Sequence, residues 1–372
     1  MLGAIREITN LTESERVGID LFAGAGGLSL GLSQAGFDMR LGIEIDPNCA
    51  ETLRRNKRNM KVIVSDIQSL RPSEIMRLAR INRKELALIA GGPPCRGFSV
   101  SNKRNRRLDN PLNTLYLEFF RFVKELSPKM FLFENVEGLS TLGEGVILRD
   151  ILRLGRKTGY SVQYAIVRAE CLGVPQRRKR ILFIGSAKDD AQIPTPESNE
   201  ICTVKDAIDD LPVLGNGNNI DMLEYSRNSD LSDYEKTMRQ NSGREVSNNL
   251  VTKNGGLVTK RYLHIPQGGN WRNIPHNLMS NYKNLENCHG WIYYRLKWNE
   301  PSIVIGNFRK NMLIHPEQHR GLSVREAARL QSFPDDYVFS GKLGSQQQQI
   351  ANAVPPLLAK WVGKSLMKAM EN

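Results

Sequence analysis

A cysteine stands where a buried strand is predicted to end. Residues 86–90 form a short apolar run bounded by turn residues, which is typical of a strand buried on both faces. Two glycines and two prolines at 91–94 then turn and stiffen the backbone, and Cys95 follows. Open α/β sheets bind their ligands at the carboxyl ends of strands. This stretch therefore predicts a thiol presented to a ligand.

The residues that follow Cys95 are cationic. Arg96 is followed by four Lys or Arg residues between 103 and 107, on a polar stretch predicted to be a loop. Positive charge near a thiol favours the thiolate, which is the nucleophilic form. An isolated cysteine is more often a structural core residue. The paired glycines, paired prolines and basic flank favour a nucleophile here.

A glycine-rich turn near the N-terminus predicts a second site. Residues 17–22 indicate a strand, 23–27 a turn and 28–35 a helix, which together form a nucleotide-type binding unit. The glycine spacing does not fit GxGxxG, and the turn has no cation for a pyrophosphate. Glu44, on a strand predicted at 39–45, lies about twenty residues beyond the turn, where an acid binds ribose hydroxyls. We therefore predict an adenosine ligand without a phosphate chain, such as S-adenosylmethionine.

Two further acids follow predicted strands. The strand at 62–64 leads to Asp66, which is placed to accept a hydrogen bond from an adenine amino group. The strand at 130–133 leads to Glu134, and a carboxylate there is expected beside the Cys95 loop. Considered alone, Glu134 would more often be a helix cap or a surface acid.

Alternating side chains before another predicted strand are expected to share a face. Residues 176–180 read QRRKR and precede a strand at 181–185. In an extended segment, alternate side chains point the same way. Gln176, Arg178 and Arg180 are therefore predicted to point into one site, and the two intervening cations away from it.

Charge favours a polyanionic partner. The chain has 52 Lys and Arg residues against 39 Asp and Glu, a formal charge of +13 at pH 7. The basic residues also cluster, at 54–61, 103–107 and 177–180. Such charge is typical of nucleic-acid-binding proteins, although a merely basic soluble protein can carry it too.

Cysteine and histidine spacing argues against a disulfide framework or a metal site. The five cysteines are odd in number and form no CxxC pair, and the five histidines form no HExxH pattern. No apolar run reaches membrane-spanning length, and residues 1–16 lack the apolar core of a signal peptide. We therefore expect a soluble, cytoplasmic protein with no membrane contact and no metal.

The second half of the chain differs from the first in amino-acid composition. The length of 372 residues favours two domains, and from about residue 187 to 312 the chain is rich in Asn, Gly, Ser and Pro. Aromatic residues there alternate with basic ones, which suits a nucleic-acid surface, although the same aromatics could form a small core. They are Trp271, Trp291, Tyr293, Tyr294 and Trp298, among Arg261, Arg272, Arg295 and Lys297.

Regular structure is predicted to return near the C-terminus. A helix is expected over 323–331, with Ser323 as its N-cap and Glu326 at the third helical position. A second helix is expected over 349–370, beginning with the turn IANAVPP.

Six sequence blocks, in one order, resemble those of the bacterial DNA (cytosine-5)-methyltransferases. The resemblance runs along nearly the whole chain, and the ordered set is far more specific than any one block. The blocks are residues 20–27, 91–95 (GGPPC), 134–136 (ENV), the alternating Gln176, Arg178 and Arg180, 325–334, and 349–355.

The resemblance implies an α/β, Rossmann-like S-adenosylmethionine-dependent methyltransferase fold with a smaller, irregular target-recognition domain. It places a catalytic domain at 1–188, the target-recognition domain at 189–344, and a C-terminal helix at 345–372 that returns to the catalytic domain. The implied partners are double-stranded DNA and a cognate restriction endonuclease that acts separately. We expect a monomer.

The resemblance also assigns site residues. The implied catalytic residues are Cys95, Glu134, Arg178 and Arg180, and the implied DNA contacts are Arg96, Ser99 and Ser101. The implied cofactor-binding residues are Phe22, Ala23, Gly24, Gly26, Gly27, Leu28, Glu44, Ile45, Asp66, Ile67, Pro93, Leu115, Asn352 and Val354.

Four positions depart from the family pattern. Arg96 stands where the family usually has Gln, Ile45 where an aromatic residue usually adjoins the adenine, and Ala351 where Gly is usual. The segment 302–305 lacks a threonine often found there. None of the four is the nucleophile, the acid or an arginine of the predicted site, so we expect an active enzyme.

The implied reaction is methyl transfer from S-adenosylmethionine to C5 of a flipped-out cytosine in a specific double-stranded DNA sequence. It proceeds through a covalent bond between Cys95 and C6 of the base. The alternatives are a tRNA cytosine-5 methyltransferase with the same catalytic residues and a catalytically inactive DNA-binding relative. A NAD-dependent enzyme is disfavoured by the glycine spacing. The long aromatic-rich stretch favours duplex DNA over tRNA.

Overall fold

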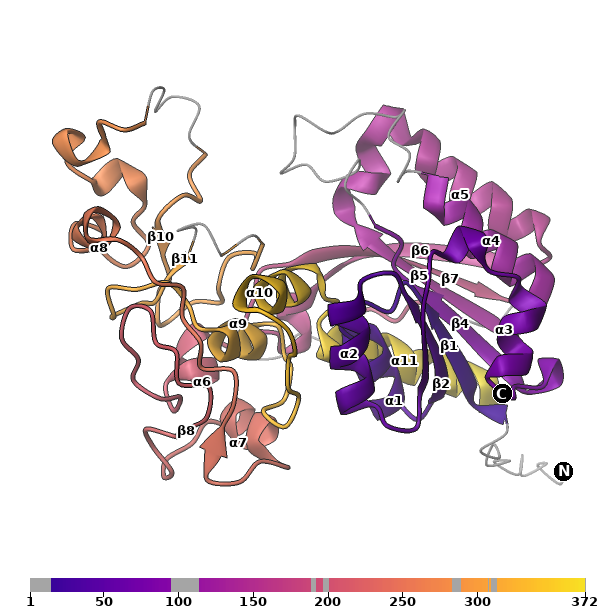
Figure 1. Ribbon diagram of the computed structural model, residues 1–372. Helices are drawn as coiled ribbons and strands as arrows, with labels where there is room; N and C mark the ends of the chain where they lie inside the picture. The colour runs from indigo at the N-terminus through magenta and orange to yellow at the C-terminus, as the bar shows by residue number, and fades with distance from the viewer. Residues whose placement is uncertain are drawn as a thin grey trace, which may run out of the picture.

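The computed structural model describes residues 15–94, 114–188, 192–196, 201–282, 289–306, 308 and 313–371. Its centre is a seven-stranded sheet in the order β3-β2-β1-β4-β5-β7-β6 (Figure 1). The strands are β1 (Val17–Leu21), β2 (Asp38–Glu44), β3 (Lys61–Val64), β4 (Leu86–Gly91), β5 (Met130–Val136), β6 (Ser161–Arg168) and β7 (Lys179–Ser186). β7 runs antiparallel to both of its neighbours, β5 and β6, and so opposite to the other six strands. The predicted α/β, Rossmann-like architecture is confirmed.

Helices cover both faces of this sheet, so the sheet part of the chain has three layers (Figure 1). One face packs on α3 (Pro72–Leu78), α4 (Leu115–Leu126) and α5 (Val146–Lys157). The other packs on α1 (Gly27–Gln34), α2 (Pro47–Asn56) and α11 (Pro356–Glu371). Strands buried between two layers need apolar side chains on both faces, which explains the continuous apolar run of β4.

A second part of the structure lies to one side of the sheet and consists of short elements (Figure 1). These are α6 (Val204–Ile208), β8 (Leu223–Glu224), α7 (Asp233–Arg239), β9 (Glu245–Val246), α8 (Gly256–Tyr262), β10 (Tyr294–Arg295), β11 (Leu313–Ile314), α9 (Val324–Leu330) and α10 (Leu343–Asn352). Its larger core includes Ala25 and Leu30 next to Phe333 and Tyr337, so it is continuous with the glycine-rich turn of the sheet part.

The end of the chain differs from the predicted single helix over 349–370. Residues 349–352 belong to α10, and α11 begins only at Pro356. Between them Ala353 is extended, with φ −64° and ψ 148°. The prolines at 355 and 356 explain the break, because Val354 and Pro355 each precede a proline and so avoid the helical region, and neither proline has an amide hydrogen to continue α10. α11 lies against the sheet part, where it packs on α1.

Other helix predictions were close. The capping box predicted for α9 is present, since Ser323 Oγ accepts from the amide of Glu326 and the Glu326 carboxylate accepts from the amide of Ser323. α3 ends at Leu78, and Arg80, two residues further on, adopts a left-handed φ of 54°. None of the helices in the described ranges is long and apolar enough to cross a lipid bilayer.

Candidate active site

The strand order reverses between β1 and β4, and the predicted site residues follow these two strands. Leu21, the last residue of β1, pairs with Gly91, the last residue of β4. A side chain at Gly91 would clash with the Leu21 carbonyl, so this close pairing requires glycine. The glycine-rich turn and the segment leading to Cys95 therefore leave the sheet side by side, at the switch point where α/β sheets bind ligands.

A buried ion pair lies next to this switch point. Arg180 Nε is 2.7 Å from Glu134 Oε1, and the two side chains are only 10% and 8% exposed. Burial raises the pKa of Glu134, while Arg180 and Arg178 oppose that rise. The carboxyl group therefore holds a proton more readily than a surface glutamate, and Arg180 fixes its orientation.

The end of β5 also contacts the segment before Cys95. A Cβ at Gly92 would lie 2.7 Å from Glu134 Oε2, so the carboxylate lies directly against the Gly92 backbone. The Asn135 side chain donates to the carbonyl of Pro93 at 3.2 Å. These contacts place Glu134 beside the chain three residues before Cys95. Cys95 itself, and with it Arg96, Ser99 and Ser101, lie outside the described residues.

The segment before β7 has the predicted alternation. Gln176, Arg178 and Arg180 are buried. Arg177 and Lys179 are about half exposed and form ion pairs with acids on the surface. The three buried side chains do not all meet in one site, however, because only Gln176 and Arg178 contact each other. Arg180 contacts Glu134, whereas Arg178 donates to backbone carbonyls of residues 305, 351 and 353.

The glycine-rich turn is tied to the end of β2. Glu44 accepts hydrogen bonds from the amides of Gly24, at 2.7 Å, and Asp46, at 2.8 Å. Burial raises the pKa of Glu44, and these amide hydrogen bonds oppose the rise. Gly24 has a left-handed φ of 54°, and a Cβ there would meet nothing within 4 Å. The hydrogen bonds to Glu44 thus fix the turn, while a side chain on Gly24 would point into space that the described residues leave open.

The residues predicted to bind a cofactor occupy several short segments. Phe22 has a φ of 69°, which a non-glycine residue adopts only at a cost of about 1–3 kcal/mol and which is enriched at functional sites. Ile45, just after β2, is 63% exposed, whereas Ile67 is buried. The set consists of Phe22, Ala23, Gly24, Gly26, Gly27 and Leu28 in the turn; Glu44 and Ile45 at the end of β2; Asp66 and Ile67 after β3; Pro93 after β4; Leu115 at the start of α4; and Asn352 and Val354 between α10 and α11.

Two contacts at the turn were not predicted. Asp20, at the end of β1, is fully buried, and its Oδ2 accepts from Ser29 Oγ at 2.5 Å. Tyr337 donates from its hydroxyl to the carbonyl of Ala25, also at 2.5 Å. The Asp20–Ser29 pair could have been found, because the two residues flank the glycine-rich turn. Tyr337 could not, because no local pattern connects positions 312 residues apart.

The aromatic and basic residues of the second part divide into two groups. Arg261 and Tyr293 are buried and bonded to each other at 2.7 Å, and buried Arg295 donates to the carbonyls of residues 262, 265, 315 and 318. Tyr293 belongs to a small core, as the alternative for the aromatic residues had it, and the two arginines are buried beside it. Trp291 is 54% exposed and remains a candidate for the nucleic-acid surface.

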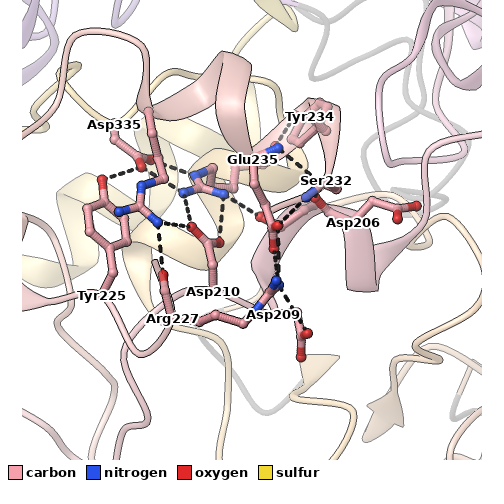
Figure 2. Close-up of polar contacts among 12 residues, drawn as sticks. Asp206, Asp209, Asp210, Tyr225, Arg227, Ser232, Tyr234, Glu235 and Asp335 are labelled. Atoms are coloured by element: carbon pink, nitrogen blue, oxygen red, sulfur yellow. Dashed lines mark hydrogen bonds and ion pairs between the residues drawn. The ribbon is translucent and has the colours of Figure 1, made fainter. Parts of the chain in front are cut away.

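Charged side chains of the block 325–334 are buried as well. Arg329 forms ion pairs with Asp335, at 2.6 Å, and Asp210, at 3.1 Å, and both acid side chains are fully buried. Tyr225 donates to the same Asp335, and Arg227 pairs with Glu235 nearby (Figure 2). Arg329 also donates to the carbonyl of Ala207 in α6, and Tyr234 of α7 donates to the carbonyl of Arg329, so α9 is joined to both helices. The arginines of this block therefore hold the second part together.

No group of His, Cys, Asp or Glu side chains suited to a metal ion occurs within the residues the structure describes. Buried His315 accepts from the amides of Glu317 and Gln318, and burial lowers its pKa to about 4. It is a neutral, hydrogen-bonded core residue.

Comparison with known proteins identifies the family. The family model "C-5 cytosine-specific DNA methylase" matches residues 17–368. The chain is 38% identical to the Type II methyltransferase M1.HphI of Haemophilus parahaemolyticus, covering 95% of this chain and 87% of that one. It is 35% identical to M.DdeI of Desulfomicrobium norvegicum, covering 95% and 89%.

A solved structure agrees with this match. The structure of an E. coli protein described as a DNA modification methyltransferase encoded within a prophage superposes with a TM-score of 0.78 at 28% identity, covering 96% of this chain and 99% of that one. The chain thus belongs to the C-5 cytosine-specific DNA methylases and is a DNA methyltransferase of the restriction-modification type.

Proposed function

We propose that the enzyme transfers a methyl group from S-adenosylmethionine to C5 of a cytosine flipped out of a specific double-stranded DNA sequence. Cys95 forms a covalent bond to C6 of the base during the reaction. The observation that supports this most strongly is the buried Glu134–Arg180 pair against the Gly92 backbone, three residues before Cys95. A base inside a duplex cannot reach such a site, so the target leaves the stack.

The proposed residues divide the chemistry between them. C5 of cytosine is a poor nucleophile, and addition of the Cys95 thiolate to C6 moves an electron pair through the ring to N3. Glu134, with its raised pKa, donates or shares a proton at N3, and Arg180 keeps that carboxyl group oriented. After C5 has gained the methyl group it loses its proton to a base such as water. The bond to Cys95 then breaks and the thiolate is restored.

The turn after β1 fits the proposed cofactor. When bound, S-adenosylmethionine supplies a methyl group on a positively charged sulfur. Glu44 offers carboxylate oxygens to the ribose hydroxyls, and the space above Gly24 is open. Exposed Ile45 offers apolar surface next to Glu44, and Asp66 offers an acceptor to the adenine amino group. The turn residues 22–28 carry no cation for a phosphate chain.

The proposed partner is duplex DNA, in the setting of a restriction endonuclease that acts separately. The net charge of +13 and exposed Trp291 support a nucleic-acid partner. Arg96, Ser99 and Ser101 are proposed to contact the DNA near the flipped base. The proposed division is a catalytic domain at 1–188, a recognition domain at 189–344 and a returning C-terminal segment at 345–372. The change from the sheet to short elements after β7 and the packing of α11 on α1 support it, although the boundary at 344 falls within α10.

A fluorine trap tests substrate and mechanism together. Duplex DNA containing 5-fluorocytosine is incubated with the enzyme and S-adenosylmethionine. Fluorine at C5 cannot leave as a proton, so elimination of Cys95 is blocked and protein stays covalently joined to DNA. We expect an adduct that survives denaturing electrophoresis, needs S-adenosylmethionine and is absent in Cys95→Ala. Methylation of ordinary cytosine with no adduct on 5-fluorocytosine would contradict the covalent route. An adduct that forms only with fluorinated tRNA would identify tRNA, not DNA, as the substrate.

A further inference from the structure

The turn between α10 and α11 is held by side chains from two distant segments. α10 ends at Asn352, and the last carbonyls of a helix have no partner within the helix. Gln331 Nε2 donates to the carbonyl of Ile350 at 2.9 Å. Arg178 Nη2 donates to the carbonyls of Ala351, at 3.2 Å, and Ala353, at 3.0 Å. The two carbonyls bound by Arg178 flank Asn352.

Arg178 is itself fixed by the segments around it. Its side chain is buried, and Nη1 donates to Gln176 Oε1 at 3.3 Å and to the carbonyl of Ile305 at 3.4 Å. Gln176 in turn accepts from the amide of Ile305 at 2.9 Å and donates to the carbonyl of Leu330. The planar guanidinium can bond several carbonyls at set angles, which an ammonium group cannot do.

The turn that Arg178 holds lies against the glycine-rich turn. A Cβ at Gly27 would clash with the carbonyl oxygen of Val354, so the two backbones are in direct contact. Val354 is buried there, while Asn352 is exposed, and its Oδ1 accepts from Gln348. A shift of residues 351–354 would therefore move the surface next to Gly27.

We propose that Arg178 is a positioning residue for cofactor binding, which acts by holding residues 351–353 so that Asn352 and Val354 meet S-adenosylmethionine beside the glycine-rich turn. This assignment rests on the proposed function, and it separates Arg178 from Arg180, two residues further along the same segment. Arg180 contacts Glu134 and serves the base, whereas Arg178 contacts the turn and serves the cofactor.

Matched lysine variants test the assignment. Arg178→Lys and Arg180→Lys each keep a cation and lose the guanidinium. Calorimetry without DNA measures the Kd of S-adenosylmethionine, and steady-state kinetics give KM for the cofactor and kcat. For Arg178→Lys we expect Kd and KM to rise tenfold or more, with kcat at saturating cofactor within threefold of the wild type. For Arg180→Lys we expect the reverse, an unchanged Kd and a large loss of kcat.

A second variant covers the case in which Arg178→Lys does not fold. Gln331→Met removes the donor to the Ile350 carbonyl, and Gln331 Oε1 has no hydrogen-bond partner among the described residues, so within them the substitution breaks only the bond to Ile350. We expect a weaker Kd for the cofactor, with kcat at saturation retained. An unchanged Kd in Gln331→Met and in any folded Arg178→Lys would overturn the assignment. Failure of the wild type to bind S-adenosylmethionine would instead overturn the proposed function.

Discussion

Burial raises the pKa of three carboxyl groups at the carboxyl edge of the sheet, those of Asp20, Glu44 and Glu134. The surroundings of the three groups then act differently on their pKa values. Two arginines oppose the rise in the pKa of Glu134, and backbone amides oppose the rise in the pKa of Glu44. Hydrogen bonds from Ser29 oppose the rise in the pKa of Asp20, but the charges of Glu44 and Glu134 raise that pKa further. Different environments at one edge thus allow one carboxyl group to carry a proton and another to remain an acceptor.

Asp20 should make the protein less stable as the pH rises. Burial raises its pKa from 3.8 to about 7, so its stabilising contribution is complete below pH 4 and declines until the pH reaches about 7. Asp20→Asn cannot titrate. We therefore expect the unfolding free energy of the wild type, relative to Asp20→Asn, to fall by roughly 2 to 3 kcal/mol between pH 5 and pH 8. Denaturant titrations of both proteins at both pH values measure this, and a pH-independent difference would contradict it.

Glu44 should contribute charge to cofactor binding. Glu44→Gln keeps the shape and an acceptor for Gly24 but loses the negative charge, and losing a charge-assisted hydrogen bond costs about 1.5–3 kcal/mol. We expect the Kd of S-adenosylmethionine to rise roughly 10- to 100-fold by calorimetry. Glu51→Gln is the control, because its side chain lies on α2 and is 63% exposed. Equal affinities in the two variants would remove Glu44 from the cofactor site.

At the scale of elements, sequence patterns predicted those features that depend on residues close together in the chain. The strands of the sheet, the turn after β1 and the cap of α9 all depend on residues close together in sequence, and they were placed within a few residues. The contacts of Tyr337 with Ala25, and of Arg178 with Ala351, were not predicted, because they join segments that meet only after folding. Composition likewise could not tell that Arg295 is a core residue.

The packing of α11 on α1 should tolerate no side chain at Gly31. A Cβ there would clash with the Pro356 carbonyl and approach Ala359, so backbone atoms would have to move. Overpacking of this kind usually costs about 1–3 kcal/mol. We expect Gly31→Ala to lower the melting temperature clearly in calorimetry. Gly243→Ala, which would meet nothing within 4 Å, should change the unfolding free energy by less than about 0.5 kcal/mol. Similar melting temperatures for both would refute the close packing.

At the scale of the whole molecule, the second part contains a core of its own. Tyr262, Ile265, Ile274, Met279 and Tyr293 cluster with Ile314, apart from the core shared with the glycine-rich turn. The ion pairs around Arg329 lie outside this cluster. A replacement confined to this cluster therefore leaves intact the core that the second part shares with the glycine-rich turn.

Exchanging residues 255–295 for those of a relative with another target should change the DNA sequence that is methylated. The reason is that this segment carries most of the separate cluster and exposed Trp291. DNA from cells that express the chimera, sequenced by a method that reads 5-methylcytosine, measures the outcome. If a chimera that still binds S-adenosylmethionine methylates the original sequence, target recognition lies in another segment.

The return of α11 to the sheet has a consequence for the order of synthesis. Leu358, Val362 and Leu366 cover an apolar face that includes Leu88 and Leu132, yet the entire second part is translated between these strands and that helix. The nascent chain therefore carries an uncovered apolar sheet face through most of its translation, the condition in which partly folded chains associate or require chaperones. The layers around the sheet close only once α11 has left the ribosome, so we expect no methylating activity before α11 has been synthesised.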